Sequence, residues 1–219
     1  RAGRALGEAG RFMSSHRVRS GMERREWLFA FVISAVHAVQ HIYLRLLPPL
    51  IPLLAADLGF PLWKLGLLVG ARSAADGLGQ TPMGMVSDRR DRRLLLPGGM
   101  AVMGGGFALF ALAPSLGAGV PAVGLLGYSF TGTFAVMSLA VVVSGAGSSA
   151  VHPTAYPLIT ANVDSSYKGR ALGMWGSAAR LGDATIPLTI GALILVTAWE
   201  SIVLVIGVLG VAYALVLFV

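Results

Sequence analysis

The sequence contains no cysteine and few charged residues. Without cysteine, the chain can form neither disulfides nor thiolate metal sites. Only 12% of the 219 residues are charged, whereas 55% are hydrophobic and come in long blocks. A soluble globular domain does not have these proportions. We therefore expect an all-α, polytopic helical membrane protein, with the lipid bilayer as its surroundings.

Signatures of cofactor and metal enzymes are also absent. The sequence has no GxGxxG between a strand and a helix, no Walker loop and no His-Glu-x-x-His, so we expect no enzyme activity and no cofactor. His37, His41 and His152 could in principle bind a metal, but no carboxylate lies at ligand spacing, and we predict no metal site. The net charge of +7 comes largely from the N-terminal segment and the loop around residue 88. It therefore indicates membrane orientation rather than nucleic-acid binding.

The chain divides into two parts of different composition. Residues 1–26 are rich in Gly, Ala, Ser and Arg and lack the apolar core of a signal peptide, so we expect a basic, disordered cytoplasmic tail. Residues 27–219 carry stretches long enough to cross a bilayer, and we interpret them as a six-helix transmembrane bundle. The predicted spans are residues 27–54, 62–86, 94–113, 132–160, 171–196 and 202–219.

The basic residues orient these spans. Positively charged segments at 1–25, 89–93 and 168–170 favour the cytoplasmic side. Six crossings place all three inside, with the N-terminus cytoplasmic and the connections 55–61 and 114–131 outside. We therefore predict a multi-pass protein of the cell membrane. Prolines at positions 48, 49 and 52 should bend or end the first span, and Pro153 should kink the fourth.

The loop between the second and third spans has the densest charge outside the N-terminal segment. Asp88 ends one helix, where it can accept backbone N–H groups or pair with an arginine. Gly84, without a Cβ, should let two helix ends approach closely. Asp91 tolerates a left-handed turn better than most residues. The predicted gating residues of this loop are Gly84, Asp88, Arg89, Arg92 and Arg93.

The pattern of this loop is Gly, three residues, Asp-Arg, two residues, Arg-Arg, and it resembles a signature of the major facilitator superfamily. The position before the final basic pair, usually Gly in that family, is Asp91 here. The resemblance implies half of a twelve-helix fold, in this case the N-terminal half, so the missing C-terminal half or a second half-chain becomes an expected partner. It also implies alternating access, with Asp88 helping to close the cytoplasmic side.

A second motif lies in the fourth span, where Gly145-Ala-Gly-Ser-Ser is followed by His152-Pro153. This arrangement resembles the fosmidomycin-resistance-type branch of the same superfamily. Small residues permit close helix contact, and a proline frees a carbonyl and kinks the helix. His152, beside that kink, is placed to reach a central cavity.

Polar side chains inside the spans are the candidates for a substrate and proton cavity, because they are costly in lipid. His37, His41 and Arg45 fall within a sector of about 80° on one helix face. Arg72 and Asp76 can pair within the second span, and Arg180 and Asp183 are neighbours in the fifth. Structural bonds between helices would explain the same residues. The predicted cavity residues are His37, Gln40, His41, Arg45, Arg72, Asp76, Gln80, His152, Tyr156, Arg180 and Asp183.

These observations favour a secondary active transporter of a small polar or anionic solute, coupled to protons. Histidines at mid-depth can bind a proton or an anion near neutral pH. Symport and antiport remain open, as do import and efflux. The alternative is a non-transporting membrane scaffold or assembly subunit that uses the same half-fold.

Overall fold

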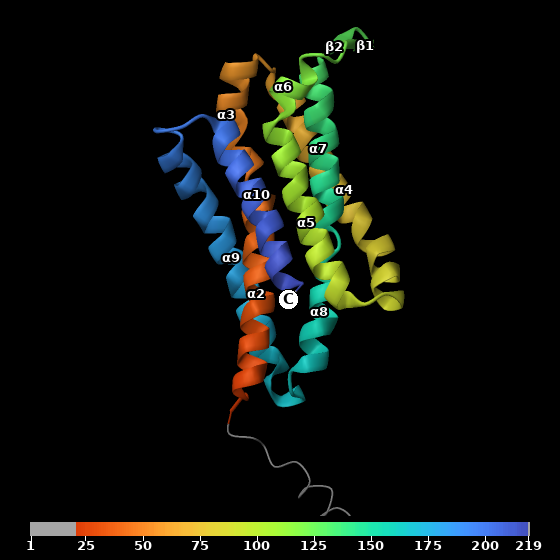
Figure 1. The fold of residues 1–219 in the computed structure, drawn as a ribbon, viewed down its shortest axis with the longest axis vertical. Helices are drawn as coiled ribbons and strands as arrows, with labels where there is room; N and C mark the ends of the chain where they lie inside the picture. Colours follow the sequence, from red (N-terminus) through yellow and green to blue (C-terminus); the bar gives the residue numbers. More distant parts are fainter. Residues whose placement is uncertain (1–20, 219) are drawn as a thin grey trace, which may run out of the picture.

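The computed structural model describes residues 21–218 as long helices that run up and down side by side (Figure 1). The expected tail of residues 1–26 lies largely outside this range. The first helix begins at Arg24 rather than at residue 27. The elements in order are α2 (Arg24–Leu44), α3 (Leu47–Leu58), α4 (Leu62–Arg89), α5 (Arg92–Ala111), α6 (Ala113–Gly117), β1 (Val123–Leu125), β2 (Tyr128–Phe130), α7 (Gly132–Ser148), α8 (Val151–Asn162), the 3₁₀ helix η1 (Ser165–Tyr167), α9 (Lys168–Leu193) and α10 (Trp199–Leu217).

Four segments of the described chain are both long and apolar enough to cross a membrane: Arg24–Leu58, Arg92–Ala111, Gly132–Asn162 and Trp199–Leu217. The remaining long helices, α4 and α9, have 28 and 26 residues. They match the predicted second and fifth spans in length, but polar residues interrupt their apolar surface. The fold is therefore an all-α membrane bundle. Four of its spans meet both criteria, length and apolar composition.

Two predicted spans are each built from two helices, and prolines explain both breaks. Proline lacks the N–H that would bond the carbonyl four residues earlier, and its ring collides with that carbonyl. Pro48 and Pro49 thus interrupt the chain at Leu44 and Arg45, where α2 ends and α3 follows. Pro153 acts on Ser149 in the same way, and α7 gives way to α8 there. The chain breaks several residues before each proline, as this geometry requires.

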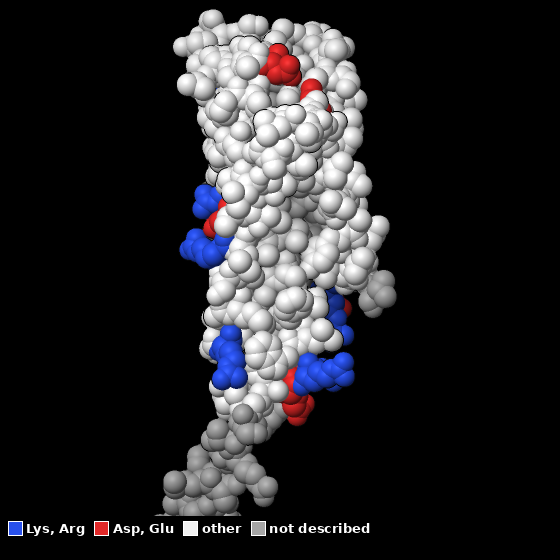
Figure 2. Space-filling model, turned by 90° about the vertical axis from the view of Figure 1, so that its left-hand side faces the viewer, with Lys and Arg blue, Asp and Glu red and all other residues white. Residues whose placement is uncertain are grey.

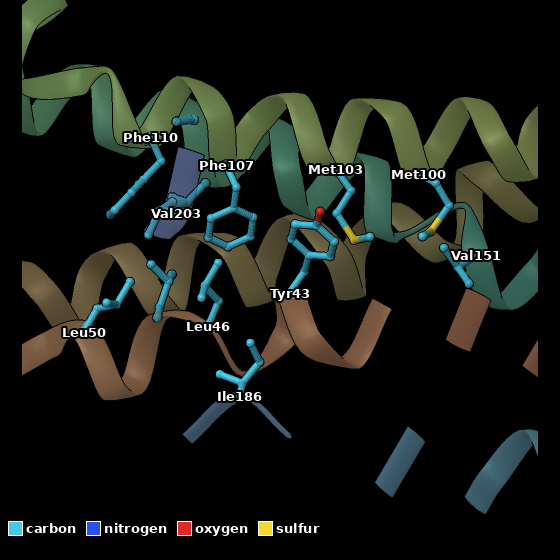
Figure 3. Close-up of a cluster of buried hydrophobic side chains, with 14 of the residues drawn as sticks. Tyr43, Leu46, Leu50, Met100, Met103, Phe107, Phe110, Val151, Ile186 and Val203 are labelled. Atoms are coloured by element: carbon cyan, nitrogen blue, oxygen red, sulfur yellow. The ribbon is translucent and has the colours of Figure 1, made fainter. Parts of the chain in front are cut away.

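Glycines let α5 pack closely against its neighbours. A Cβ added at Gly106 would meet the backbone of Ser144 on α7 at 2.6 Å. One added at Gly104 would meet the Gly207 carbonyl of α10 at 2.8 Å. The larger side chains of α5 fill the centre of the bundle, where Met103 and Phe107 are fully buried beside Tyr43 of α2 (Figure 3). Helix α5 is consequently at the centre of the apolar core.

The outer connection predicted at residues 114–131 contains local structure that the sequence pattern did not indicate. It holds the short helix α6 and a hairpin in which β1 pairs with β2 antiparallel, Val123 opposite Phe130. Leu126 and Gly127 form the turn, both with positive φ, at 50° and 79°. Such a turn suits the twist of a two-residue hairpin, although leucine is an unusual choice for it. The hairpin lies at the upper end of the molecule in Figure 1.

Candidate functional site

Helices α2 and α9 are in close contact where their polar residues lie. Gly182 of α9 carries no side chain, and a Cβ there would collide with the Ala38 carbonyl and lie 2.9 Å from the His41 Cβ. This close approach places Asp183 of α9 against the face of α2 that carries His41 and Arg45. The predicted α2 face therefore meets a carboxylate from another helix.

Asp183 is the centre of a charged cluster that lies at the C-terminal end of α2 and near the middle of α9. Its Oδ1 accepts from His41 Nδ1 at 3.0 Å and from Arg45 Nε at 2.9 Å. Its Oδ2 accepts from Arg180 Nη1 at 3.2 Å, so the expected contact between these neighbours on α9 is formed. Only 18% of the Asp183 side chain is exposed, against 51% for Arg45 and 80% for Arg180. The carboxylate is thus enclosed, while both guanidinium groups open outward.

A group of aromatic rings continues from this cluster toward α8. The His37 ring lies 4.6 Å from that of His41, 5.2 Å from that of His152 and 4.2 Å from that of Trp175. His37 Nδ1 lies 2.9 Å from the Trp175 carbonyl oxygen. Because that oxygen can only accept, Nδ1 carries the hydrogen, and Nε2 of the neutral ring is left as an acceptor. Nε2 is buried and meets no hydrogen-bond partner in the described part of the chain.

Gln40 connects α2 to the break between α7 and α8. Its Nε2 donates to the Ser148 carbonyl at 3.2 Å and to Ser148 Oγ at 3.0 Å. The same nitrogen lies 3.5 Å from His152 Nδ1. Gln40 Oε1 has no partner among residues 21–218. The helix break therefore brings the two predicted residues together, with an unpaired acceptor beside them.

Arg72 and Asp76 do not form the ion pair that their spacing predicted. Arg72 is 2% exposed, its guanidinium carbon lies 5.8 Å from the centre of the Phe107 ring, and none of its three guanidinium nitrogens meets an acceptor among the described residues. The Asp76 Oδ1 is likewise unpaired there. Gly145 of α7 packs directly against the α4 backbone at these two residues, so Arg72 extends toward α5 instead of along its own helix.

Two predicted cavity residues are not joined to the others. Tyr156 on α8 is 54% exposed, and its carbonyl accepts from Thr160 Oγ1. No interaction within the described chain connects the side chain of Gln80 or Tyr156 to the histidines. No group of three or more metal-ligating side chains with suitable geometry occurs in the described residues either.

The predicted gating loop is a tight connection, because α4 continues to Arg89 and α5 begins at Arg92. Asp88 Oδ1 accepts from Arg92 Nη2 at 3.0 Å. Arg92 also donates to Ser87 Oγ, and Ser87 in turn donates to the Pro153 carbonyl. The loop is thereby tied to α8. Arg89 and Arg93 are exposed.

Two expectations about this loop need correction. Asp91 adopts an extended conformation with φ −65°, not a left-handed one, and its side chain caps α5 by accepting from the Arg93 N–H at 2.9 Å. Aspartate is among the best residues for such a cap. A Cβ at Gly84 would lie 3.9 Å from the Pro153 Cβ, which is ordinary contact. Gly84 is therefore not required by a close helix approach in this structure.

Sequence reasoning missed Trp175 and Lys64. The sequence around Trp175 indicates only a core aromatic residue. The fold places its ring and carbonyl next to His37. Lys64 Nζ lies between 5.4 and 5.8 Å from the ring centres of Phe60, Trp63, Phe130 and Phe134 and donates to the Ser129 carbonyl. Phe60 and Trp63 lie within four positions of Lys64, but Phe130 and Phe134 lie far along the chain, in β2 and α7. No helical spacing links these two residues to Lys64.

The geometry described above, a helical membrane bundle with charged groups at mid-span, agrees with comparisons to known proteins. A "Probable L-galactonate transporter" from Escherichia coli (strain K12) is 28% identical over 159 residues, an alignment that covers 73% of this chain and 31% of that protein. The chain thus spans about a third of the length of this relative. The sequence model of the Major Facilitator Superfamily matches residues 33–219. The chain therefore belongs to the Major Facilitator Superfamily of membrane transport proteins.

Proposed function

We propose that this chain forms the N-terminal, six-span half of a secondary active transporter that moves a small polar or anionic solute together with protons. The solute binds in a central cavity that opens alternately to the two sides of the membrane. In this proposal the cavity is lined by α2, α4, α8 and α9, which carry the polar residues described above. Helices α5, α7 and α10 supply the rigid apolar support.

The observation that carries this proposal is the exposed charge at mid-span. Arg45 lies about 6 Å from the middle of the Arg24–Leu58 segment, at 1.5 Å per residue. Exposed arginines at that depth are too costly to face hydrocarbon, so Arg45 and Arg180 must face water or protein. A transport cavity provides water around these arginines, and a second half-bundle provides protein.

The balance of charge supports an anionic solute. Away from the ends of the spans, Arg45, Arg72 and Arg180 are opposed by Asp76 and Asp183. The imidazoles of His37, His41 and His152 lie beside these charges. L-galactonate, named in the relative from Escherichia coli, is a sugar acid with one carboxylate. A solute of this class fits a cavity with excess positive charge.

Two further observations support six crossings and a cytoplasmic lower end. Helices α4 and α9 span about 42 and 39 Å at 1.5 Å per residue, longer than the hydrocarbon core of about 30 Å. Their polar residues then face the cavity rather than lipid. The basic residues on the face in Figure 2 lie at its lower end and at mid-height, whereas the upper end shows only acidic residues; further acidic residues lie beside the basic ones lower down. This distribution favours a cytoplasmic lower end.

The test is uptake into proteoliposomes by the full-length transporter that contains this chain. A panel of sugar acids, the matching neutral sugars and dicarboxylates is supplied with and without an inward proton gradient. We expect saturable uptake of at least one polar solute, stimulated by the gradient. Uptake indifferent to the gradient would remove proton coupling. A folded protein that moves none of the panel would favour the scaffold alternative.

A further inference from the structure

The cluster around Asp183 has the composition of an anion site that is already occupied by a group of the protein itself. Arg45 donates one N–H to the Asp183 Oδ1, and Arg180 donates one N–H to the Asp183 Oδ2. Guanidinium forks are well matched to carboxylates, and such bonds are among the strongest hydrogen bonds in proteins. Asp183 is therefore bound as a carboxylate ligand would be.

The two arginines also remain accessible to a solute. Each guanidinium has five N–H donors, and in the described part of the chain only one from each is bound to Asp183. The Arg180 side chain is 80% exposed and that of Arg45 51%. Arg45 lies at the break between α2 and α3, near the middle of the Arg24–Leu58 segment, and Arg180 lies near the middle of α9, so a dissolved anion in the cavity meets these donors first. The site thus has a protein carboxylate on its inner side and open donors on its outer side.

Charge balance couples an incoming anion to a proton. With His41 neutral, Arg45, Arg180 and Asp183 together carry one net positive charge. A monoanion that binds the arginines lowers this to zero and leaves Asp183 enclosed without its counter-charges, which is unfavourable. One proton taken up from water by the hydrogen-bonded His41–Asp183 pair restores the original charge. Anion and proton binding therefore favour each other.

The other charged and titratable groups near the cluster do not replace this pair. His37 on α2 stacks on His41, and His152 on α8 lies beyond His37. Asp76 on α4 has an Oδ1 that meets no hydrogen-bond partner among the described residues. On α3 the carboxylate of Asp57 is bonded to Trp199 at the outer end. None of these groups forms a hydrogen bond with Asp183 or the two arginines among the described residues.

We propose that Asp183 is a built-in counter-ion that occupies a carboxylate-binding site formed by Arg45 and Arg180. A substrate carboxylate displaces it from both arginines while the His41–Asp183 pair takes up one proton. This inference rests on the proposed transport function and adds to it the substrate's charged group, the residues that bind it and the group that couples it to protons.

The experiment measures binding and uptake by the full-length transporter, with L-galactonate, D-galactonate and D-gluconate as probes and galactitol as the neutral control. Wild type should bind at least one acid and ignore galactitol. Asp183→Asn removes the competing charge but keeps the size. It should bind that acid at least about tenfold more tightly near pH 8, the factor expected from one charge-assisted bond released. Its affinity should vary less between pH 5 and 8, and proton-driven accumulation should disappear while exchange of labelled for unlabelled acid persists.

Two further variants keep the result interpretable. Asp57→Asn makes the same chemical change outside the cluster and should leave the affinity and its pH dependence as in wild type. Arg180→Gln alters an exposed side chain, so it should fold, and it should weaken acid binding at least about tenfold. The inference is overturned if Asp183→Asn binds acids no more tightly than wild type, or if Arg180→Gln binds them equally well. Uptake restricted to neutral solutes would overturn the carboxylate site while leaving the transport function intact.

Discussion

At the scale of single residues, helical spacing predicted the contacts within one helix but not those between helices. The neighbours Arg180 and Asp183 do meet, as a spacing of three suggests. The same rule failed for Arg72 and Asp76, because Gly145 of α7 packs against the α4 backbone there and Arg72 extends toward Phe107. Asp183 also binds His41 and Arg45. These contacts depend on how α2 and α9 pack, and the sequence pattern of a single helix does not predict this packing.

Arg72 provides a prediction at this scale, because its buried guanidinium meets no hydrogen-bond acceptor among the described residues, and a buried charge without one destabilises a fold. Arg72→Met keeps a long flexible chain and removes the charge. We expect it to stabilise the transporter by about 1–4 kcal/mol, as replacement of buried ionic groups by apolar ones often does. Thermal melting in detergent measures this. Arg72→Lys retains a charge and should show no gain, and a lower melting temperature for Arg72→Met would mean that the guanidinium is paired in the full-length protein.

At the scale of elements, the apolar runs predicted the long helices well, with limits that differ from the observed ones by only a few residues. Apolar composition marks a span clearly, whereas its ends are set by caps such as Asp91, which the sequence reading took for a turn residue. The breaks after α2 and α7 were predicted from Pro48, Pro49 and Pro153, whereas Pro52, of which the same was expected, lies inside α3. The hairpin of β1 and β2 was not predicted, because its turn relies on a left-handed leucine.

The contact between α2 and α9 can be tested with two glycines of the same helix. A Cβ at Gly182 would meet the Ala38 backbone and the His41 Cβ, whereas one at Gly176 meets nothing within 4 Å. Gly182→Val should therefore separate the helices and destabilise the protein by about 1–3 kcal/mol, the usual cost of overpacking. It should also reduce transport by disturbing the Asp183 cluster. Gly176→Val is the matched control, and equal melting temperatures for the two variants would contradict the packing described here.

The loop between α4 and α5 offers a second test at the element scale. Asp88→Asn removes the exposed pair with Arg92, which contributes at most about 1 kcal/mol, so melting should change little. If Asp88 helps to hold the cytoplasmic side closed, the maximal rate should fall while substrate binding stays within about twofold. Asp91→Asn in the same loop preserves the cap, since Asn caps as well as Asp, and should transport normally. Lost binding in Asp88→Asn with normal turnover would exclude a gating role.

At the scale of the whole molecule, the sequence predicts six spans that alternate with basic segments on one side, and four of these spans are long and apolar enough to cross a membrane in the described chain. The basic residues 89–93 lie where α4 ends and α5 begins, and residues 168–170 form the first turn of α9, after α8 and η1. Both segments lie toward the end of the bundle where α2 begins (Figure 1). Lys64, held among four aromatic rings and bonded to Ser129, ties the opposite end of α4 to the hairpin. A lysine of the second span thus stabilises the predicted outer surface, a function that the positive-inside rule cannot reveal.

The sequence has no cysteine, so a single introduced cysteine can report which side of the membrane its position faces. Ser115 on α6 and Ser166 in η1 are both exposed and lie at opposite ends of the bundle. Six crossings with a cytoplasmic N-terminus predict that Ser115→Cys reacts with a membrane-impermeant maleimide added to intact cells. Ser166→Cys should react only after the membrane is opened. The two exposed positions serve as controls for one another, since each must label fully in detergent.

Labelling of Ser166→Cys in intact cells would reverse the orientation. Labelling of both would show that α7 and α8 do not form one crossing, and the transport cavity could not then lie between α2, α4, α8 and α9.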